Sequence, residues 1–453
     1  MGNADADWVS RLADEVIVEA ERRAPGKPVV CASGLSPSGP IHLGNLREVM
    51  TPHLVADEIR RRGIGCRHLL SWDDYDRFRR VPAGIDPAWS EHIGKPLTSV
   101  PAPPGSEFPN WAEHFKAPMV AALHQLGIEF DGISQTERYT TGAYTDAVLL
   151  AMRERRRIDV VLARYRTKQN GAASKEYFPY RPYCTVCERD LTTVTEYDEA
   201  STEFSFSCEC GHSQTTQLAG HKHGKLAWKV DWPMRWAYEG VIFEPSGVDH
   251  RSPGSSFTVG GEIVGEIFGG WQPIGPRYGF IGITGMGKMS SSAGDVPTPS
   301  DALEIMEPPL LRWLYARRRP SQEFKIAFDQ ELHRLYDEWD ALGRKIACGS
   351  AQSGDAAAYG RAVRTAAGDL PTTPRPLPYR TLTSIVDITT GHDGQTLRIL
   401  RDLDPDDPVT ALDQARPRLD LAQRWVDTQL PAEQRTRIRQ TPDLGLIESL
   451  SPT

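Results

Sequence analysis

The chain has 453 residues, of which 39% are hydrophobic and 25% charged, a composition typical of folded proteins rather than disordered or fibrous ones. Its 52 Lys and Arg against 60 Asp and Glu give a net charge of -8, which argues against wholesale coating of a polyanion but leaves room for local basic patches. No apolar run reaches the roughly 18 residues of a membrane helix, and the N-terminus lacks the apolar core of a signal peptide. We therefore expect a cytoplasmic protein with two or three domains.

The first 76 residues predict the opening of a doubly wound α/β domain. Apolar periodicity predicts helices over 8–23 and 46–59, and short apolar runs predict strands at 28–32 and 67–72. A loop rich in Gly, Ser and Pro, residues 34–40, joins the first strand to the second helix. In such domains ligands bind at the carboxyl ends of the strands.

The pattern changes twice further along the chain. Between about 150 and 225 a basic run, a polar stretch and a cysteine cluster indicate an insertion. Strand-like segments return at 240–244 and 278–283. Beyond residue 300 the periodicity predicts mainly helices, at 310–315, 324–339, 384–388 and 411–430.

The loop before the second helix is a candidate phosphate site. A strand that runs into a helix N-terminus offers free backbone N–H groups to an anion. Ser36 and Ser38 add hydroxyl donors, and Gly44 lets a nucleotide approach the backbone closely. His42 and Asn45 each bring one more hydrogen-bond donor. A tight turn with a histidine facing the helix explains the loop alone about as well.

A second candidate lies some 245 residues further on. Residues 285–294 form a glycine- and serine-rich segment that contains Lys288, Ser290 and Ser291. A cation over a triphosphate neutralises charge that develops as pyrophosphate leaves. Alone, such a segment is usually a surface linker, but the two segments together are more specific.

Together these segments resemble a known family. Residues 42–45 (His-Leu-Gly-Asn) resemble the HIGH motif of class I aminoacyl-tRNA synthetases, and residues 288–292 (Lys-Met-Ser-Ser-Ser) resemble the KMSKS motif. Further likeness is specific to the class I lysyl-tRNA synthetases and lies in residues 32–39, 72–76 and 247–250. The resemblance extends over most of the chain, from about residue 8 to 450.

The resemblance implies a class I synthetase fold: an α/β Rossmann catalytic domain with a zinc-binding insertion, followed by an α-helical C-terminal domain that meets the anticodon end of tRNA. The expected segments, in order, are the first catalytic half, the insertion, the second catalytic half and the helical domain: 1–150, 151–225, 226–300 and 301–453.

The resemblance also implies ATP-dependent activation of L-lysine, with Mg²⁺, and transfer of the lysyl group to tRNA(Lys). It assigns catalytic roles to His42, Asn45, Lys288 and Ser290. It assigns ATP contacts to Ser36, Ser38, Gly44, Asp249, His250 and Ser291. It assigns lysine contacts to Gly34, Asp73, Trp228, His250 and Tyr278, because an ammonium favours aromatic faces and carboxylates. Core packing also explains Trp228 and Tyr278, and a loop cap explains Asp73.

The cysteine cluster predicts a structural zinc site. Cys184-x-x-Cys187 and Cys208-x-Cys210 place four thiolates at a spacing that suits one tetrahedral ion. A reducing cytoplasm disfavours disulfides, and unliganded cysteines are the alternative. Because Cys-x-Cys is tighter than the usual Cys-x-x-Cys, replacement of one sulfur by His212 is also open.

Two departures from the family pattern leave the acceptor open. Ala293 stands where relatives commonly have a second lysine, with Asp295 nearby, and the chain stops at Thr453, earlier than the family's helical domain. We therefore hold three alternatives: a lysine–tRNA ligase, a lysine-activating paralogue that transfers to a non-tRNA acceptor, and a non-catalytic tRNA- or lysine-binding regulator. The first is preferred because the catalytic half and the insertion match throughout.

Overall fold

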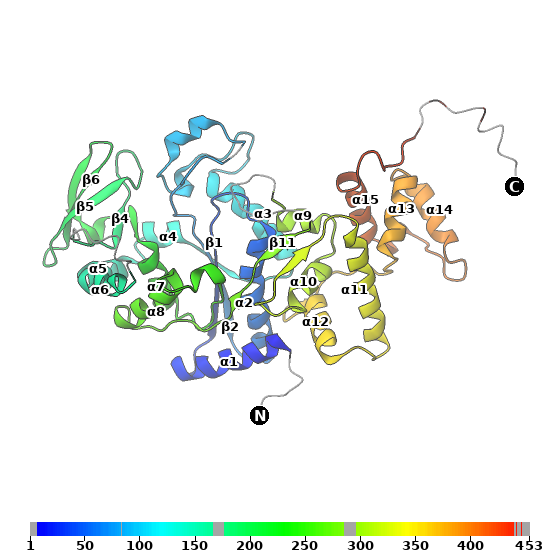
Figure 1. Ribbon diagram of the computed structural model, residues 1–453, viewed down its shortest axis with the longest axis horizontal. Coiled ribbons are helices and arrows are strands. Elements are labelled where there is room, and N and C mark those ends of the chain that lie inside the picture. Colours follow the sequence, from blue (N-terminus) through cyan, green and yellow to red (C-terminus); the bar gives the residue numbers. More distant parts are fainter. Residues whose placement is uncertain are drawn as a thin grey trace. The chain divides into compact units, whose positions relative to one another are not determined.

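The structure is a computed structural model that describes residues 7–82, 84–165, 176–284 and 296–438, together with 441 and 445. The chain divides into two compact units (Figure 1). Unit 1 comprises Met1–Asp301, Arg312–Ile326 and Gln352–Leu370, and unit 2 comprises Ala302–Leu311, Ala327–Ala351 and Pro371–Thr453. Among the described residues, no helix combines the length and the apolar character needed to cross a membrane.

Unit 1 is built on a parallel sheet of β1 (Val29–Leu35), β2 (Cys66–Trp72) and β3 (Asp131–Ser134), in that order. Strand β1 is almost entirely buried, as expected for a strand covered on both faces. Helix α2 (Leu43–Arg61) packs against β1 and β2, and α1 (Trp8–Arg23) packs against α2. The carboxyl ends of β1 and β2 are level, because Leu35 pairs with Trp72.

An apolar cluster joins the sheet to α7 (Trp228–Glu239) and α8 (Ser256–Glu266). It includes Val30 and Leu69 from the sheet, Trp236 from α7 and Val264 from α8. On the free side of β1, the Phe243 carbonyl accepts a hydrogen bond from the Ala32 amide at 2.8 Å. Helices α7 and α8 and the segment around Phe243 are therefore packed against the sheet.

Unit 1 contains further helices and short strand pairs, of which α5 and α6 lie beside the inserted strands rather than on the sheet (Figure 1). Its further helices are η1 (Pro87–His92), η2 (Leu97–Ser99), α3 (Trp111–Gln125), α4 (Gln135–Thr140), α5 (Thr145–Arg153), α6 (Arg155–Ala163), η5 (Val248–His250) and α12 (Ser353–Val363). Three short strand pairs are β9 (Ser246–Gly247) with β10 (Arg277–Tyr278), β11 (Ile281–Ile283) with β12 (Phe324–Ile326), and β13 (Arg364–Thr365) with β14 (Gly368–Asp369). The chain passes from unit 1 to unit 2 within α9 (Pro299–Leu303) and back to unit 1 within α10 (Pro308–Ala316).

The inserted segment contains two small antiparallel sheets. One is formed by β4 (Tyr180–Pro182) and β8 (Gly224–Leu226). The other is a meander of β5 (Thr192–Tyr197), β6 (Glu203–Cys208) and β7 (Ser213–Gln217), followed by η4 (Leu218–Gly220). Phe204 and Phe206, on the buried face of β6, belong to a core shared with α5, α6 and α8.

Unit 2 contributes α11 (Glu331–Ala347), α13 (Tyr379–Ile388), α14 (Asp393–Asp402), η6 (Leu412–Gln414) and α15 (Arg418–Thr428). In its core, the rings of Tyr336 and Tyr379 stack with centroids 4.0 Å apart. Arg418 is buried beside them and is bound by Glu307 at 2.7 Å and Asp340 at 2.9 Å. The core of this unit therefore combines a stacked tyrosine pair with a buried network of ion pairs.

The predicted opening of helix, strand, helix and strand is confirmed. Helix α1 has the predicted bounds, 8–23, and α2 and β2 extend beyond theirs. Strand β1 begins at Val29 and ends at Leu35, slightly later at both ends than predicted. The segment 240–244 does not form a full strand; its Phe243 makes one isolated bridge to Cys31 of β1 and another to Ile274. The predicted helix 324–339 is wrong at its start. Residues 324–326 alternate buried and exposed side chains and pair with β11, and α11 begins only at Glu331.

Candidate active site and cysteine cluster

Cavity A, of about 250 Å³, opens at the carboxyl ends of β1 and β2. Six of the residues predicted from sequence line it: Gly34, Ser36, Asn45, Asp73, Trp228 and His250. Its wall also includes Trp232 and Trp236, which follow Trp228 at four-residue intervals on one face of α7. Aromatic faces therefore dominate one side of the cavity, an arrangement that suits an organic cation.

A buried arginine holds the acidic wall of cavity A in place. Arg235 donates to Asp73 at 2.6 Å, donates to Asp231, and lies 5.6 Å from the centre of the Trp228 ring. Burial opposes the charge on Arg235, but Asp231 and Asp73 outweigh it and raise its pKa. Asp73 is thus already paired within the protein.

Two further carboxyls border cavity A, and sequence reasoning singles out neither. Glu244 accepts hydrogen bonds from the indole N–H groups of Trp232 at 3.1 Å and Trp236 at 2.6 Å. Burial raises the pKa of Glu244 to about 7. Burial, with Glu244 and Asp73 adding like charge, raises the pKa of Glu48 to about 8. An entering cation would favour the ionised forms of both.

Cavity B, of about 810 Å³, adjoins the start of α2. It is lined by the predicted residues His42, Gly44, Asn45, Asp249, His250 and Tyr278. The Nδ1 atom of His42 accepts the Gly44 amide hydrogen bond at 3.1 Å and caps α2. Because burial also lowers the pKa of His42, the ring is neutral at physiological pH, and Nε2 carries the proton. His42 therefore keeps one donor for a phosphate oxygen.

Cavities A and B share Asn45, Glu48 and His250. The resemblance predicts that Tyr278 contacts lysine together with Gly34 and Trp228, which line cavity A. Tyr278 instead lines cavity B. Burial and the charge of Glu48 raise the pKa of Tyr278 well above the usual value. A ligand that spans the two cavities would pass the three shared residues.

Both flanks of the lysine-bearing segment border this site. Gly282, in β11, lines cavity B, and the Leu43 amide at the start of α2 donates to the Pro297 carbonyl at 2.9 Å. Lys288, Ser290 and Ser291 themselves lie outside the described residues, as does Ala293. Ser38 lines neither cavity; its carbonyl accepts from the Trp111 indole at 3.2 Å.

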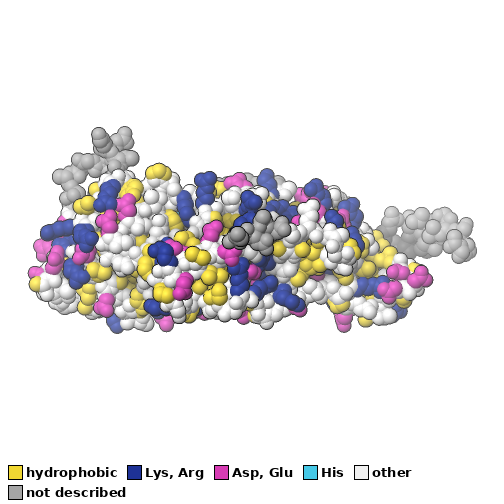
Figure 2. Space-filling model, turned by 90° about the horizontal axis from the view of Figure 1, so that it is seen from below, with side chains coloured by type: hydrophobic (Ala, Val, Ile, Leu, Met, Phe, Trp, Pro, Cys, Tyr) yellow, Lys and Arg dark blue, Asp and Glu magenta, His cyan; other side chains and the backbone are white. Residues whose placement is uncertain are grey.

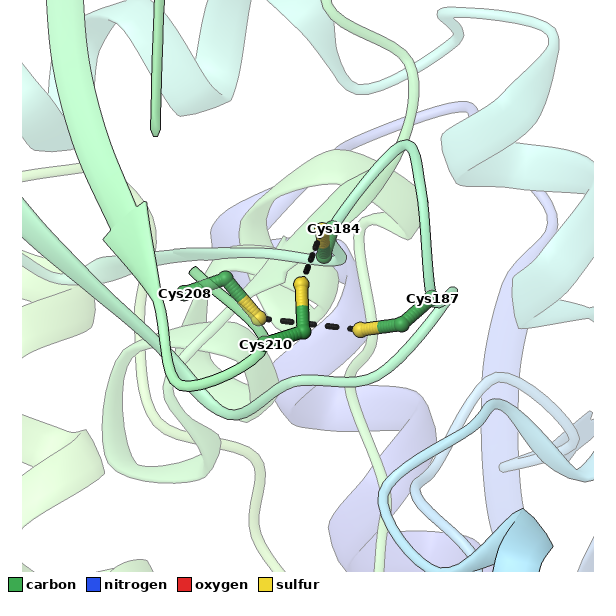
Figure 3. A group of neighbouring side chains, drawn as sticks. All are labelled: Cys184, Cys187, Cys208 and Cys210. Atoms are coloured by element: carbon green, nitrogen blue, oxygen red, sulfur yellow. Dashed lines mark hydrogen bonds between the residues drawn. The ribbon is translucent and has the colours of Figure 1, made fainter. Parts of the chain in front are cut away.

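The four cysteine thiols converge in the inserted segment, and Figure 3 shows their sulfurs pointing toward one another. Sγ of Cys184 is 3.7 Å from that of Cys210, Sγ of Cys187 is 3.6 Å from that of Cys208, and all four lie within 4.8 Å. Four sulfurs around zinc at about 2.3 Å stand roughly 3.8 Å apart, so the cluster fits a tetrahedral ion.

Backbone turns support the same interpretation of the cluster. The Val186 amide donates to Sγ of Cys184 at 3.4 Å, and the Cys208 amide donates to the His212 carbonyl at 2.8 Å. Nε2 of His212 lies 3.3 Å from Oγ1 of Thr185. Cys210 rather than His212 completes the set of four in the described residues.

Some of the residues that sequence reasoning misses do carry a signal in the sequence. Glu48 lies one helical turn after Asn45, on the same face of α2. Trp228, Trp232 and Trp236 recur every four residues, which indicates one helix face. Arg235 carries no such signal, because its partner Asp73 is 162 residues away.

Comparisons with known proteins identify the family. The family tRNA synthetases class I (K) matches residues 6–368. A lysine–tRNA ligase of Streptomyces coelicolor is 65% identical over 98% of this chain and 82% of its own length, and one of Pyrococcus horikoshii is 34% identical over 96% and 83%. The arginyl-tRNA synthetase structure of Thermus thermophilus covers 91% of this chain and 83% of its own at 10% identity, with a TM-score of only 0.32. This chain belongs to the class I (K) tRNA synthetases.

Proposed function

We propose that the protein activates L-lysine with ATP to lysyl-adenylate and transfers the lysyl group to tRNA(Lys). The observation that carries this proposal is the 65% identity to a lysine–tRNA ligase over nearly the whole chain. The same alignment disfavours the two alternatives, a lysine-activating paralogue with a non-tRNA acceptor and a non-catalytic regulator. A ligase that charges tRNA acts where translation takes place, so we assign it to the cytoplasm.

The architecture follows from the same assignment. Residues 1–150 and 226–300 form the two halves of a Rossmann catalytic domain, interrupted by the insertion 151–225. The parallel order β1-β2-β3, with cavities at the carboxyl ends, supports this. Residues 301–453 then form the helical domain that meets the anticodon end of tRNA. The helices of unit 2 support this, although 312–326 and 352–370 belong to unit 1.

Cavity A holds the lysine. Its side-chain ammonium lies against the faces of Trp228 and Trp232 and is neutralised by Glu48 and Glu244, which both ionise more readily once a cation enters. Gly34 and Ser36 meet the other end of the amino acid, and Asp73 acts through its pair with Arg235 rather than as a free counter-ion.

Cavity B holds ATP with its Mg²⁺. Nε2–H of His42 and the side chain of Asn45 donate to phosphate oxygens, while Gly44 leaves room for the nucleotide beside the backbone. Asp249 and Tyr278 complete the nucleotide side, with Tyr278 moved here from the lysine pocket. The roles of Ser38, which lines neither cavity, and of Ser291 in ATP binding rest on the resemblance alone. Lys288 and Ser290 stabilise the charge that grows as pyrophosphate leaves. The lysine carboxylate then meets the α-phosphate near His250, which borders both cavities.

Two assays on one preparation test the activity. Lysine-dependent ATP–pyrophosphate exchange measures activation alone, and charging of total tRNA with labelled lysine measures the whole reaction. We expect both, and we expect His42→Ala to lower exchange by about 10²-fold or more, mainly in kcat, the scale expected when one electrostatic donor is removed. Exchange with a different amino acid but not lysine would contradict the lysine assignment.

The cysteine cluster holds a structural zinc ion through Cys184, Cys187, Cys208 and Cys210. With four protein ligands no coordination position is left for a substrate, so the ion supports folding of the insertion. Metal analysis should give about one zinc per chain in the wild type and less in Cys184→Ser, together with a lower unfolding temperature. Cys348→Ser is the matched control, since Cys348 is an exposed thiol outside the cluster. A wild type without zinc would contradict the assignment.

A further inference from the structure

Cavity B, in which we place ATP, has few positive charges on its wall. Among the described residues that line it there is no arginine and a single lysine, Lys325. Three carboxyl groups line the same cavity: Glu48, Asp249 and Glu323. By sequence, the segment 285–295 adds one cation and one anion, Lys288 and Asp295. Binding of a triphosphate in cavity B therefore depends strongly on each cation that the wall provides.

The protein as a whole does not supply a positive field that could replace these local cations. Its net charge is -8, and Figure 2 shows that Lys and Arg side chains are scattered over the visible face rather than gathered in one large patch. Exposed charges more than about 10 Å apart are also largely screened at 0.1 M salt. A polyphosphate must therefore be held by the cations of the cavity wall itself.

Lys325 is exposed and lies in β12, where it pairs with Gly282 of β11. The alternation of the strand buries Phe324 and Ile326 and leaves Lys325 on the other face. Because Gly282 has no side chain, the stem of Lys325 lies across it: a Cβ atom at position 282 would be 3.4 Å from Cγ of Lys325 and 4.0 Å from Cε. In the described part of the chain, no carboxylate lies within 4.0 Å of the Lys325 ammonium. Lys325 therefore offers cavity B a cation that no ion pair neutralises.

Arg47 fixes the strand pair of β11 and β12 to helix α2. Its side chain is buried, and Nη1 donates to the carbonyls of Gly279 and Gln322, both at 2.8 Å. These two residues come shortly before β11 and β12, and the guanidinium also lies 5.0 Å from the centre of the Phe324 ring. The N-terminus of the same helix is capped by His42, the proposed phosphate donor. One helix therefore holds both the phosphate donor and the strand that carries the lysine.

We infer that Lys325 binds the β- and γ-phosphates of ATP and neutralises the charge that grows on them as pyrophosphate leaves. This inference rests on the proposed function and adds a residue to its first step. Lys325 lines cavity B but not cavity A, so it serves the part of ATP that does not meet lysine near His250, and an ammonium pairs with phosphate rather than with a neutral base. In this step a carboxylate oxygen of lysine bonds to the α-phosphorus, the bond from that phosphorus to the bridging oxygen breaks, and pyrophosphate leaves with the electron pair. A cation beside the leaving group stabilises it.

The test compares Lys325→Met with Lys325→Arg and with a control, Lys345→Met. Lys345 is an exposed lysine of α11 that lines neither cavity A nor cavity B. In lysine-dependent exchange, we expect Lys325→Met to lower kcat/KM for ATP about 10²-fold and to raise the KM for pyrophosphate, with the KM for lysine within about twofold of wild type. Lys325→Arg keeps the positive charge and should recover most of the loss, and Lys345→Met should match wild type.

Equilibrium binding in the absence of lysine separates a phosphate contact from a disturbed cavity wall. AMP lacks the two phosphates that we assign to Lys325. Lys325→Met should therefore weaken the binding of ATP with Mg²⁺ about tenfold or more and leave the binding of AMP unchanged. Equal losses for ATP and AMP, or wild-type ATP binding and exchange in the folded variant, would overturn the inference. A wild type that binds ATP but shows no lysine-dependent exchange would instead overturn the proposed function.

Discussion

Each unit buries an arginine between two carboxylates, and the two sites differ in what surrounds them. Arg418 of unit 2 is held by Glu307 and Asp340, lies 4.8 Å from the centre of the Tyr336 ring, and has a side chain only 2% exposed. Arg235 of unit 1 is held by Asp73 and Asp231 and lies over Trp228, but it also lines cavity A. The same combination of guanidinium, carboxylates and aromatic ring is thus enclosed by packing in unit 2 and borders the cavity proposed to bind lysine in unit 1.

The two buried arginines differ in their neighbours rather than in the geometry of their own ion pairs. Around Arg418 the remaining acceptor positions are satisfied by the protein, since Thr373 donates to Glu307 at 2.6 Å. Around Arg235, the buried Glu244 and the half-buried Glu48 are carboxyls with raised pKa values beside an open volume. Such perturbed carboxyls in a cavity are typical of functional sites. Glu48 and Glu244, rather than the carboxylates paired with Arg235, are therefore the groups that we expect to respond to a cation in cavity A.

The largest expected effect is on stability and comes from unit 2. Arg418→Met leaves Glu307 and Asp340 buried without a counter-charge, which should lower the free energy of unfolding by about 3–5 kcal/mol in urea titrations. Arg424→Met is the control, because its ion pair with Glu304 is exposed and should contribute about 0–1 kcal/mol. Exchange measured on the folded fraction should stay near wild type. A large loss of exchange at full folding would show that Arg418 is not purely structural.

The second effect is on lysine activation and comes from unit 1. Arg235→Met releases Asp73 and removes the cation beside Trp228, so that the wall of cavity A loses its fixed position. Misplacement on the order of 1 Å costs about 10²-fold, and we expect that loss in kcat/KM for lysine in the exchange assay. Arg67→Met, which breaks an exposed pair with Asp131, is the control.

Folding must be checked for Arg235→Met, since two carboxylates lose their partner. If thermal unfolding shows that the variant does not fold, Arg235→Lys keeps the charge but loses the planar fork that reaches Asp73 and Asp231 together. It should fold and still raise the KM for lysine. Wild-type kinetics in a folded Arg235 variant would place this arginine with Arg418 as a packing element.

The sequence predicts local elements better than it predicts these sites. Helix α1 and strands β1 and β2 follow from periodicity, because their side-chain pattern depends on neighbours within a few residues. Strand β12 escapes prediction, since its three residues become a strand only by pairing with β11, some 40 residues earlier. Arg235 and Asp73 illustrate the same limit within the site: each is an ordinary charged residue until the fold brings them to 2.6 Å.

The residues of the candidate site also fall into those that a local sequence segment predicts and those that depend on contacts between distant segments. His42 and Asn45 are predictable because a motif segment carries them, and Trp228 is assigned only by its position in the resemblance. The structure places all three on the walls of cavities A and B. The placement of Tyr278 in cavity B depends on the pairing of β10 with β9, which no local pattern in the sequence specifies. Glu244 follows a buried segment, and its importance arises from two indole donors one turn apart on α7.

The weakest effect that we expect is a pH dependence of lysine activation that arises from Glu48, a carboxyl of cavity A that has no cationic partner among the described residues. Burial and like charge raise the pKa of Glu48 to about 8, so near pH 7 most free enzyme carries it protonated and uncharged. Raising the pH ionises Glu48, and the negative carboxylate attracts the lysine ammonium. Because kcat/KM reports the free enzyme, kcat/KM for lysine should increase roughly tenfold from pH 7 to 8.5 and level off above the pKa of Glu48.

Glu48→Gln should flatten this rise, while Arg418→Met, which leaves cavity A intact, should retain it. A wild-type profile that is flat over this range would show that the ionised Glu48 does not bind the substrate, and the ammonium would then have to be neutralised by Glu244, whose pKa of about 7 places its own rise about one pH unit lower.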